Sequence, residues 1–334
     1  MLRCCFSHFS ACFAVASIGP RVRRHRRHIL SLTSSLPVPR ALEQPRCVWA
    51  AEAELGEGTL WSVRDQALYW VDILGWQLHR FAPADGAKSS WRFEEEISAV
   101  AERANSPGLL VTLRRGFALF DPALPDGPPR YLHQPEEPAS NRFNDGTCDR
   151  QGRFWGGTMD LACREATGSL YRFEADGACT RHESGITVSN GPAWSADGRT
   201  MYFNDTAPNR ILAYDFEPEA GTLSNRRQWL RLAPGDGYPD GMTTDAAGRL
   251  WICHWGGACV SCHDPLSGEE LTRITLPAAH ITNCAFGGPD LRTLYITSAW
   301  SDLDAAQRKT QPLAGALFAV ALDTPGLPAP LFGG

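Results

Sequence analysis

The chain has 334 residues, of which 43% are hydrophobic and 21% are charged, as in an ordinary globular protein. No run of about 18 uncharged apolar residues occurs, so no membrane-spanning helix is expected and a membrane is excluded as a partner. The net charge is −5; residues 1–46 carry +7 (eight Arg, one Glu), which leaves −5 − 7 = −12 for residues 47–334. Such an acidic body argues against nucleic acid as a partner.

The N-terminal segment differs from the rest of the chain. Residues 5–19 are mildly apolar and are followed by the run RVRRHRRH, the reverse of the charge order in a secretory signal. The charge run could target an organelle or bind nucleic acid, and an unused upstream start codon is another alternative. We predict an unstructured basic extension over residues 1–46 and one domain over residues 47–334.

The eleven cysteines are scattered and do not resemble a disulfide framework. A single Cys-x-x-Cys, Cys259 to Cys262, falls in an expected strand, and no second pair follows it. This favours structural thiols over a metal or redox site. Free thiols are best suited to a reducing cytoplasm, which is the predicted location.

A repeat runs through the body of the chain. Successive β-rich segments are marked by Leu68, Leu110, Phe154, Met201, Leu250 and Leu294, which are 42, 44, 47, 49 and 44 residues apart. A second strand-like segment follows each marker, and turns rich in Asp and Gly separate the strands. A period in the forties is typical of β-propeller blades. We predict an all-β, six-bladed β-propeller with a central channel, in which residues 47–51 or the C-terminal tail complete the last blade and most Trp and Phe side chains pack between blades.

Polar residues recur at one phase of this repeat, about ten to twelve positions before each marker. They are Glu57, Ser98, Asn144, Asn190, Asp240 and Asn283, of which only Ser98 lacks a carboxylate or an amide. Asn-Gly and Asp-Gly alone indicate no more than turns. Because innermost strands begin at one mouth of a propeller channel, however, residues in register should face one axis. The pattern predicts a ring of oxygen ligands of the kind that hard divalent cations prefer.

Five segments carry a resemblance to a known family. They are LGEGTLW (55–61), RFNDGTCDRQGRFWGGTM (142–159), VSNGPAWSADGRTMYFNDT (188–206), YPDGMTTDAAGRLWICHWGG (238–257) and NCAFGGPDLRTLYITSA (283–299). The chain resembles the senescence-marker-protein/gluconolactonase/regucalcin family of sugar lactone lactonases over residues 47–334. The resemblance implies a six-bladed propeller with one divalent metal, Ca²⁺ before Mg²⁺, Mn²⁺, Zn²⁺ or Fe²⁺.

The resemblance also implies roles for individual residues. The metal ligands correspond to Glu57, Asn190 and Asp240, and the substrate-binding residues correspond to Arg142 and Asn144. Some members have an acidic substrate contact after the Gly-Thr-Met motif, where this chain has Ala162 with Glu165 nearby. The implied activity is metal-dependent hydrolysis of an aldonolactone to its aldonic acid, with a small sugar lactone as the partner.

A hydrolysis mechanism follows as a hypothesis. The metal would polarise the lactone carbonyl, Asp240 would transfer the proton of the attacking water, and Arg142 would orient the substrate. A serine nucleophile is disfavoured because no Gly-x-Ser-x-Gly occurs and Ser189 has no evident His partner, while His254 is expected to be structural. Hydrolysis of other esters or phosphotriesters, or a non-catalytic calcium-binding regulator, are the alternatives.

Overall fold

The computed structural model describes residues 36–124 and 127–334, so the apolar segment and the arginine run predicted before residue 36 lie outside the described residues. Four antiparallel four-stranded sheets follow one another along the chain: β2 (Gly56–Ser62), β3 (Ala67–Asp72), β4 (Gln77–Ala82) and β5 (Ala87–Arg92); β6 (Ile97–Glu102), β7 (Leu109–Leu113), β8 (Gly116–Phe120) and β9 (Arg130–His133); β10 (Asn141–Cys148), β11 (Phe154–Asp160), β12 (Gly168–Phe173) and β13 (Cys179–Ile186); β14 (Ser189–Trp194), β15 (Thr200–Asp205), β16 (Arg210–Glu217) and β17 (Thr222–Leu230).

The rest of the chain forms an eight-stranded sheet with two halves. One half is β18 (Tyr238–Thr244), β19 (Leu250–Trp255), β20 (Cys259–His263) and β21 (Glu270–Thr275); the other is β22 (His280–Gly287), β23 (Thr293–Ala299), β24 (Leu317–Ala321) and β1 (Arg46–Trp49). The halves are linked by one pair, Trp255 with His280. Helix α1 (Ala305–Thr310) follows β23, and no helix in the described ranges is long and apolar enough to cross a membrane.

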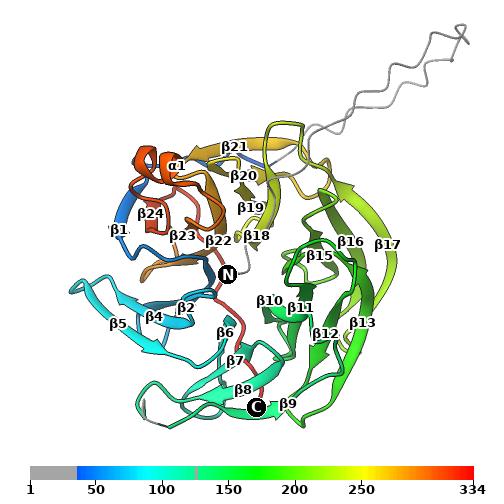
Figure 1. Ribbon diagram of the computed structural model, residues 1–334. Coiled ribbons are helices and arrows are strands. Elements are labelled where there is room, and N and C mark those ends of the chain that lie inside the picture. The colour runs from blue at the N-terminus through cyan, green and yellow to red at the C-terminus, as the bar shows by residue number, and fades with distance from the viewer. Residues whose placement is uncertain (1–35, 125–126) are drawn as a thin grey trace, which may run out of the picture.

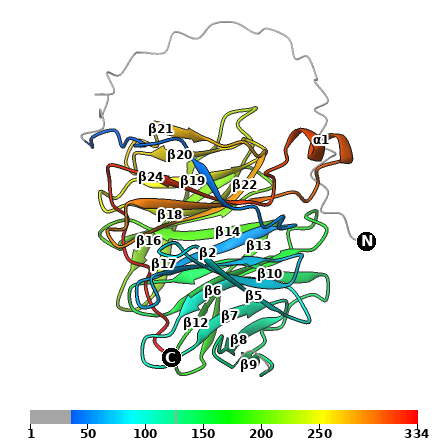
Figure 2. The ribbon, with the colours of Figure 1, turned by 90° about the vertical axis from the view of Figure 1, so that its left-hand side faces the viewer.

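The sheets are arranged around a common axis, as Figure 1 shows, with β2, β6, β10 and β18 near the axis and β5, β9, β13 and β17 at the periphery. The predicted all-β class is therefore confirmed, and the fold is a β-propeller. The predicted marker segments are β3, β7, β11, β15, β19 and β23, the second strands of the successive meanders. Seen from the side, α1 stands out from the body of strands (Figure 2).

Each innermost strand has a register shift where the sequence pattern places a polar residue. The shifts lie between Glu57 and Leu60, Ile97 and Ala99, Phe143 and Asp145, Asn190 and Ala193, Pro239 and Met242, and Ile281 and Cys284. A bulge of this kind places an extra residue in one strand and turns its side chain out of the regular alternation. Gly58 (φ 56°) and Gly191 (φ 79°) supply the left-handed backbone directly after Glu57 and Asn190.

The innermost strands contact one another in the order β2, β6, β10, β14, β18 and β22, and β22 returns to β2. The bulged positions of neighbouring strands are therefore brought to one place on the axis. This arrangement positions the candidate site.

Apolar side chains from facing sheets fill the space between them. One cluster joins β3 and β4 to β7 and β8 through residues that include Val71, Leu78 and Val111, and another joins β11 and β12 to β15 and β16. The indoles of Trp61, Trp70, Trp155 and Trp251 are almost completely buried, as predicted for packing between blades. At about 25 cal/mol/Å² and roughly 200 Å² each, the burial of one indole contributes about 5 kcal/mol before entropy is counted.

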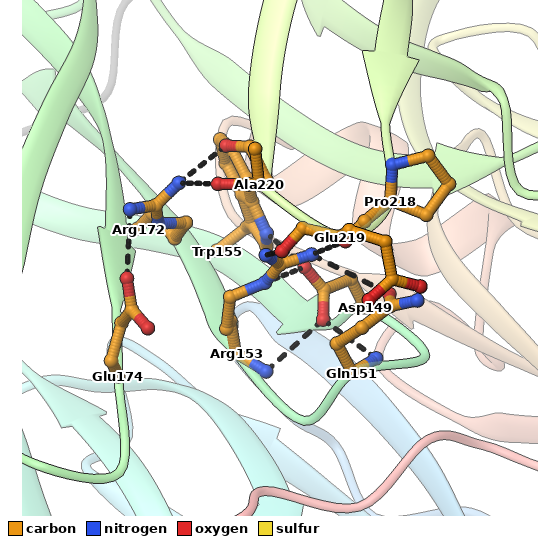
Figure 3. Close-up of polar contacts among 10 residues, drawn as sticks. Asp149, Gln151, Arg153, Trp155, Arg172, Glu174, Pro218, Glu219 and Ala220 are labelled. Carbon is orange, nitrogen blue, oxygen red and sulfur yellow. Dashed lines mark hydrogen bonds and ion pairs between the residues drawn. The ribbon is translucent and has the colours of Figure 1, made fainter.

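Two buried ion pairs repeat the same arrangement in different sheets. Asp149 accepts hydrogen bonds from Arg153 Nε (2.7 Å) and Trp155 Nε1 (2.9 Å), and Asp245 accepts the same pair of bonds from Arg249 and Trp251. Figure 3 shows how Arg153 extends past Asp149 to the backbone of the β16–β17 turn, where it donates to the carbonyl oxygens of Pro218 and Glu219. Each of these Asp–Arg–Trp groups, called a clamp below, therefore joins its own sheet to a neighbouring segment.

The N-terminal part of the described chain is held to the last sheet. β1 pairs antiparallel with the outer edge of β24, which confirms that a segment around residues 47–51 completes this sheet. Residues 36–46, assigned to the extension, also contact the body: Arg40 forms an ion pair with Asp323 (3.0 Å), and the Pro37 carbonyl accepts from Arg249. Folding of the last sheet thus brings together residues almost 300 positions apart.

We expect Asp149→Asn to lower the free energy of unfolding by about 3–5 kcal/mol, because the buried Arg153 guanidinium loses its carboxylate. Chemical denaturation would measure the change. Asp215→Asn is the matched control, since the Asp215–Arg227 pair lies on the surface, and should leave the midpoint unchanged. Equal midpoints for the two variants would contradict a stabilising clamp.

Four histidines, His79, His254, His263 and His280, are buried within the sheets. Burial lowers the pKa of His79, His254 and His280 to about 4. His79 packs against Trp49 and Trp70, and the His280 ring stacks on Trp255 at 4.1 Å between ring centroids. These rings are therefore neutral in the folded protein at neutral pH.

We expect the contribution of these histidines to the free energy of unfolding to fall as the pH decreases from about 6.5 towards 4. In this window the unfolded chain binds protons at these histidines and the folded chain does not, so each contributes a slope of up to about 1.4 kcal/mol per pH unit. Urea midpoints between pH 7 and 5 would measure the slope, and His79→Phe should reduce it. The buried carboxyl groups of Glu57, Asp145 and Asp240 have raised pKa values and contribute a slope of opposite sign, so the test is the difference between the wild-type protein and His79→Phe. Equal slopes for the two proteins would exclude the effect.

Candidate active site

The bulged strands bring the predicted site residues to a single cavity on the axis. Its polar lining consists of Glu57, Arg142, Asn144, Asn190, Thr206 and Asp240, with Ser301, and its apolar lining consists of Leu55, Met159, Cys163, Val188 and Trp255. All five residues predicted to bind metal or substrate therefore line one cavity, although they come from four sheets. Ser98 and Asn283 hold ring positions but do not belong to this lining.

A chain of hydrogen bonds runs across the polar lining. Arg142 Nη1 donates to Asn144 Oδ1 (2.6 Å), and Asn144 Nδ2 donates to Asn190 Oδ1 (3.0 Å) and to the Ser189 carbonyl (2.7 Å). Asn190 Nδ2 then donates to Thr206 Oγ1 (2.8 Å). Both amides are thus fixed in orientation, and Asn190 Oδ1 keeps one lone pair for a further ligand.

Thr206 ends this chain and ties it to the next sheet. Its hydroxyl donates to the Pro239 carbonyl (2.7 Å), directly before Asp240, while its oxygen accepts from Asn190. Asn204, in strand β15, donates to the Asp240 carbonyl (2.5 Å). The backbone that presents Asp240 is therefore positioned by side chains of the preceding sheet.

Three carboxyl groups are buried beside this network. Burial, reinforced by the charge of Asp145, raises the pKa of Glu57 to about 8, and burial raises the pKa of Asp145 to about 7. Burial and the charges of Glu57 and Asp145 also raise the pKa of Asp240 well above its usual value. Hydrogen bonds from the Gly58 amide and from Asn283, together with the positive charge of Arg142, only partly offset the rise in the pKa of Glu57.

Asp145 was not assigned a role from the sequence. Its carboxylate accepts from the backbone amides of Gly146 (2.7 Å) and Gly191 (2.8 Å) and from Asn283 Nδ2 (3.4 Å). The bond from Gly191 fixes the backbone of the bulge that follows Asn190. Asn283, at another of the predicted ring positions, helps to hold the Asp145 carboxylate. The sequence indicated Asp145 only by its position beside Asn144 in Asn-Asp-Gly. Because the strand has a bulge here, the sequence could not predict which of the two neighbouring side chains faces the axis.

The donor chemistry fits a hard divalent cation. Glu57 and Asp240 offer carboxylate oxygens, and the lone pair of Asn190 Oδ1 is an amide ligand of the same kind. A cation would also offset the electrostatic repulsion that raises these pKa values. The described residues contain no group of three or more His, Cys, Asp and Glu side chains arranged to hold a metal ion, so amide oxygens are needed to complete such a site.

Arg142 lies between this cavity and a second cleft. It is 2% exposed, and its Nε has no hydrogen-bond partner within the described residues. The second cleft, of about 660 Å³, is lined by Arg142 together with Arg114, Arg115 and the acidic residues Glu94, Glu95, Glu96, Glu136 and Glu137. A guanidinium held between acidic surroundings with a free donor is suited to an oxygen of a bound molecule.

The remaining predictions concern residues outside the reactive centre. His254 is buried and bonds the Asp236 carbonyl through Nδ1 and Ser261 through Nε2, which agrees with a structural role. Ser189 is buried without a partner for its hydroxyl among the described residues and does not line the cavity. Ala162 and Glu165 do not line it either, and Cys163 from the same loop does.

Comparisons with known proteins show which family the chain resembles. Residues 55–300 match the model of the SMP-30/Gluconolactonase/LRE-like region. The chain is 38% identical to a 6-deoxy-6-sulfogluconolactonase of Pseudomonas putida (87% of this chain, 99% of the relative) and 35% identical to the pentonolactonase XacC of Haloferax volcanii (82% and 93%). The crystal structure of a calcium-binding protein, regucalcin, of Agrobacterium tumefaciens superposes with a TM-score of 0.81 at 29% identity (86% and 96%).

We expect Thr206→Val to lower the free energy of unfolding by about 1–3 kcal/mol. The substitution keeps the shape of the side chain but leaves Asn190 Nδ2 and the Pro239 carbonyl without their partner. Thr222→Val, at an exposed position of β17, is the matched control and should change it by about 0.5 kcal/mol or less. A Thr206→Val protein as stable as the control would mean that the hydrogen-bond chain has no structural value.

Proposed function

The chain belongs to the SMP-30/gluconolactonase/LRE-like family, whose lactonases are hydrolases of cyclic esters, and we propose that this enzyme opens a sugar lactone to its open-chain acid. The observation that carries the proposal is the convergence of Glu57, Arg142, Asn144, Asn190 and Asp240 on one cavity. The named activities of the sulfogluconolactonase and the pentonolactonase support the substrate class. Aldonolactones of pentoses and hexoses are the proposed substrates.

We infer that the propeller has six blades. The eight-stranded sheet consists of two four-stranded meanders that share only the Trp255–His280 pair, so it can be divided at that point. Six bulged inner strands would then each begin one blade. This count supports a ring in which ligands from different blades meet on the axis.

We propose that one divalent cation is bound by Glu57, Asn190 and Asp240. Ca²⁺ is the favoured ion because the donors are oxygens and a structural relative is described as calcium-binding, and Mg²⁺, Mn²⁺, Zn²⁺ and Fe²⁺ are the alternatives. When bound, the ion supplies Lewis acidity that polarises the lactone carbonyl and lowers the pKa of water.

Arg142 and Asn144 are proposed to orient the substrate. The free Nε of Arg142 would donate to a substrate oxygen, while its Nη1 stays bonded to Asn144 and keeps the guanidinium plane fixed. A donor held in place before the substrate binds loses little conformational entropy on binding. The same residue favours hydrolysis over a metal-buffer function, since cation storage requires no substrate-orienting donor.

Asp240 is proposed to transfer the proton. Its carboxylate would accept a proton from the water that attacks the carbonyl carbon, and the C–O bond to the ring oxygen would then break. Asp240 would return the proton to that oxygen, which leaves a hydroxyl group and a carboxylic acid. As a ligand of the cation Asp240 would be a weak base, so the lowered pKa that the cation gives the water would supply most of the activation.

We propose that the protein acts in the cytoplasm. None of the eight cysteines among the described residues forms a disulfide, and several of them, such as Cys253 and Cys262, are buried in strands. A reducing compartment accords with this set of thiols.

We expect Asp240→Asn to reduce kcat for lactone hydrolysis by about 10²–10⁴-fold, because the amide cannot accept the proton. We also expect EDTA to abolish activity and a divalent ion to restore it. A panel of aldonolactones, with acid release followed by a pH indicator, would measure both.

The control for the substitution is Asp215→Asn on the surface, which should keep full activity. Thermal unfolding of metal-free protein with and without added ion gives a readout of cation binding that needs no turnover. Full activity of the metal-free protein would refute the cation proposal. Turnover of simple esters or phosphotriesters but of no lactone would replace the substrate class, and cation binding without any turnover would favour the regulatory alternative.

A further inference from the structure

The cavity has two chemically different parts. The bulged strands supply its polar floor, with Glu57, Asn144, Asn190 and Asp240. The wall comes from strand ends and loops and includes Met159 at the end of β11, Cys163 after it and Val188 before β14. A substrate whose carbonyl group reaches the floor must therefore present its remote end to the wall.

The wall on this side is apolar. Met159, Cys163 and Val188 form a hydrophobic cluster that is separate from the cores between the sheets, and Ala207 packs against it. Leu55 and Trp255 continue the apolar lining, and Trp255 is fixed by stacking on His280 with an angle of 6° between the ring planes. The lining has two hydroxyl groups: that of Thr206 is bonded to Asn190 and to the Pro239 carbonyl, and that of Ser301 belongs to the segment after β23 and not to this cluster.

A turn after β11 determines which side chain reaches the wall. The Cys163 amide donates to the Asp160 carbonyl (2.9 Å), and Asp160 Oδ2 accepts from the amides of Arg164 (3.1 Å) and Glu165 (3.2 Å). With φ of 56° at Cys163, this turn buries the thiol side chain and leaves Arg164 and Glu165 exposed. The charged residues of the loop are therefore held outside the cavity.

This division has a chemical consequence for the remote end of a lactone. A hydroxyl that is buried against Met159, Cys163 and Val188 loses its bonds to water and gains none, which is unfavourable. A methyl group at the same place buries apolar surface, which is favourable. The wall therefore discriminates between substituents that differ only by one hydroxyl.

We propose that the Met159–Cys163–Val188 wall selects lactones whose carbon chain ends in a methyl group, such as 6-deoxyhexonolactones, over lactones that end in a hydroxymethyl group. This inference rests on the proposed lactonase function and specifies its substrate class. Floor residues act on the ester group that all lactones share, and the wall residues distinguish among them.

The test compares two substrates that differ by one oxygen atom, mannono-1,4-lactone and 6-deoxymannono-1,4-lactone of the same enantiomer. We expect kcat/KM to be about 10- to 100-fold higher for the deoxy lactone, with the difference mainly in KM, because an apolar pocket discriminates against an added hydroxyl to this extent. A ratio of one or less would overturn the proposal.

Val188→Thr places a hydroxyl in the wall without changing the shape of the side chain, and we expect it to reduce the ratio at least about threefold. Val63→Thr, at an exposed position in the β2–β3 turn, is the matched control and should keep the wild-type ratio. Met159→Gln is a second variant that tests the same wall if Val188→Thr fails to fold. An unchanged ratio in a folded wall variant would overturn the assignment of selectivity to these residues.

The failure of this inference and the failure of the lactonase proposal have different results. If the wild-type enzyme hydrolyses other lactones but does not prefer the deoxy member of the pair, only the selectivity is wrong. If it hydrolyses no lactone in a broad panel, both proposals are wrong.

Discussion

The convergence of bulged inner strands on one axis is the constraint on which the rest of the structure depends. Each bulge turns a polar side chain towards the axis, so Glu57, Asp145 and Asp240 are buried together although their charges repel. Such burial disfavours folding unless protons or a cation neutralise the charge. Stabilisation comes from the other ends of the same strands: β10 begins beside Arg142 at the cavity and ends beside Asp149, whose clamp ties three segments together. One end of β10 thus carries residues of the candidate site, and the other end carries the ion pair that stabilises the fold.

Much of this arrangement could be predicted because it depends on local sequence. Turn residues and apolar strands repeat at a period in the forties, and each repeat carries a polar residue at the same phase, as at Asn144 and Asn190. Because similar sheets are arranged around one axis, residues at the same position of successive repeats lie close together in space. The sequence could therefore place residues from four sheets in one cavity without knowledge of any distance between them. The clamps that contain Asp149 and Asp245 also repeat in sequence, but only the folded chain shows that their arginines reach other segments.

What the sequence could not predict depends on backbone irregularity or on long-range contact. A bulge breaks the strict alternation of a strand, so alternation cannot decide whether Asn144 or Asp145 faces a given neighbour. Cys163 enters the cavity through a turn with positive φ, which no propensity favours for cysteine. Thr206 belongs to a strand end, and its role appears only when Pro239 of the next sheet is beside it. Likewise, the contact of residues 37–41 with the body requires partners near residue 323.

The two parts of the cavity differ in how freely they can change. The floor is built into bulged strands whose backbone also forms the sheets, and its residues share hydrogen bonds, so a change at Asn190 disturbs Asn144 and Thr206 as well. The wall is built from strand ends and a loop, and Met159, Cys163 and Val188 form a small cluster that is separate from the cores between the sheets. A substitution in this cluster leaves the hydrogen bonds between Asn144, Asn190 and Thr206 in place. On the proposal made above, the wall can therefore change what the remote end of a substrate meets without altering the polar floor.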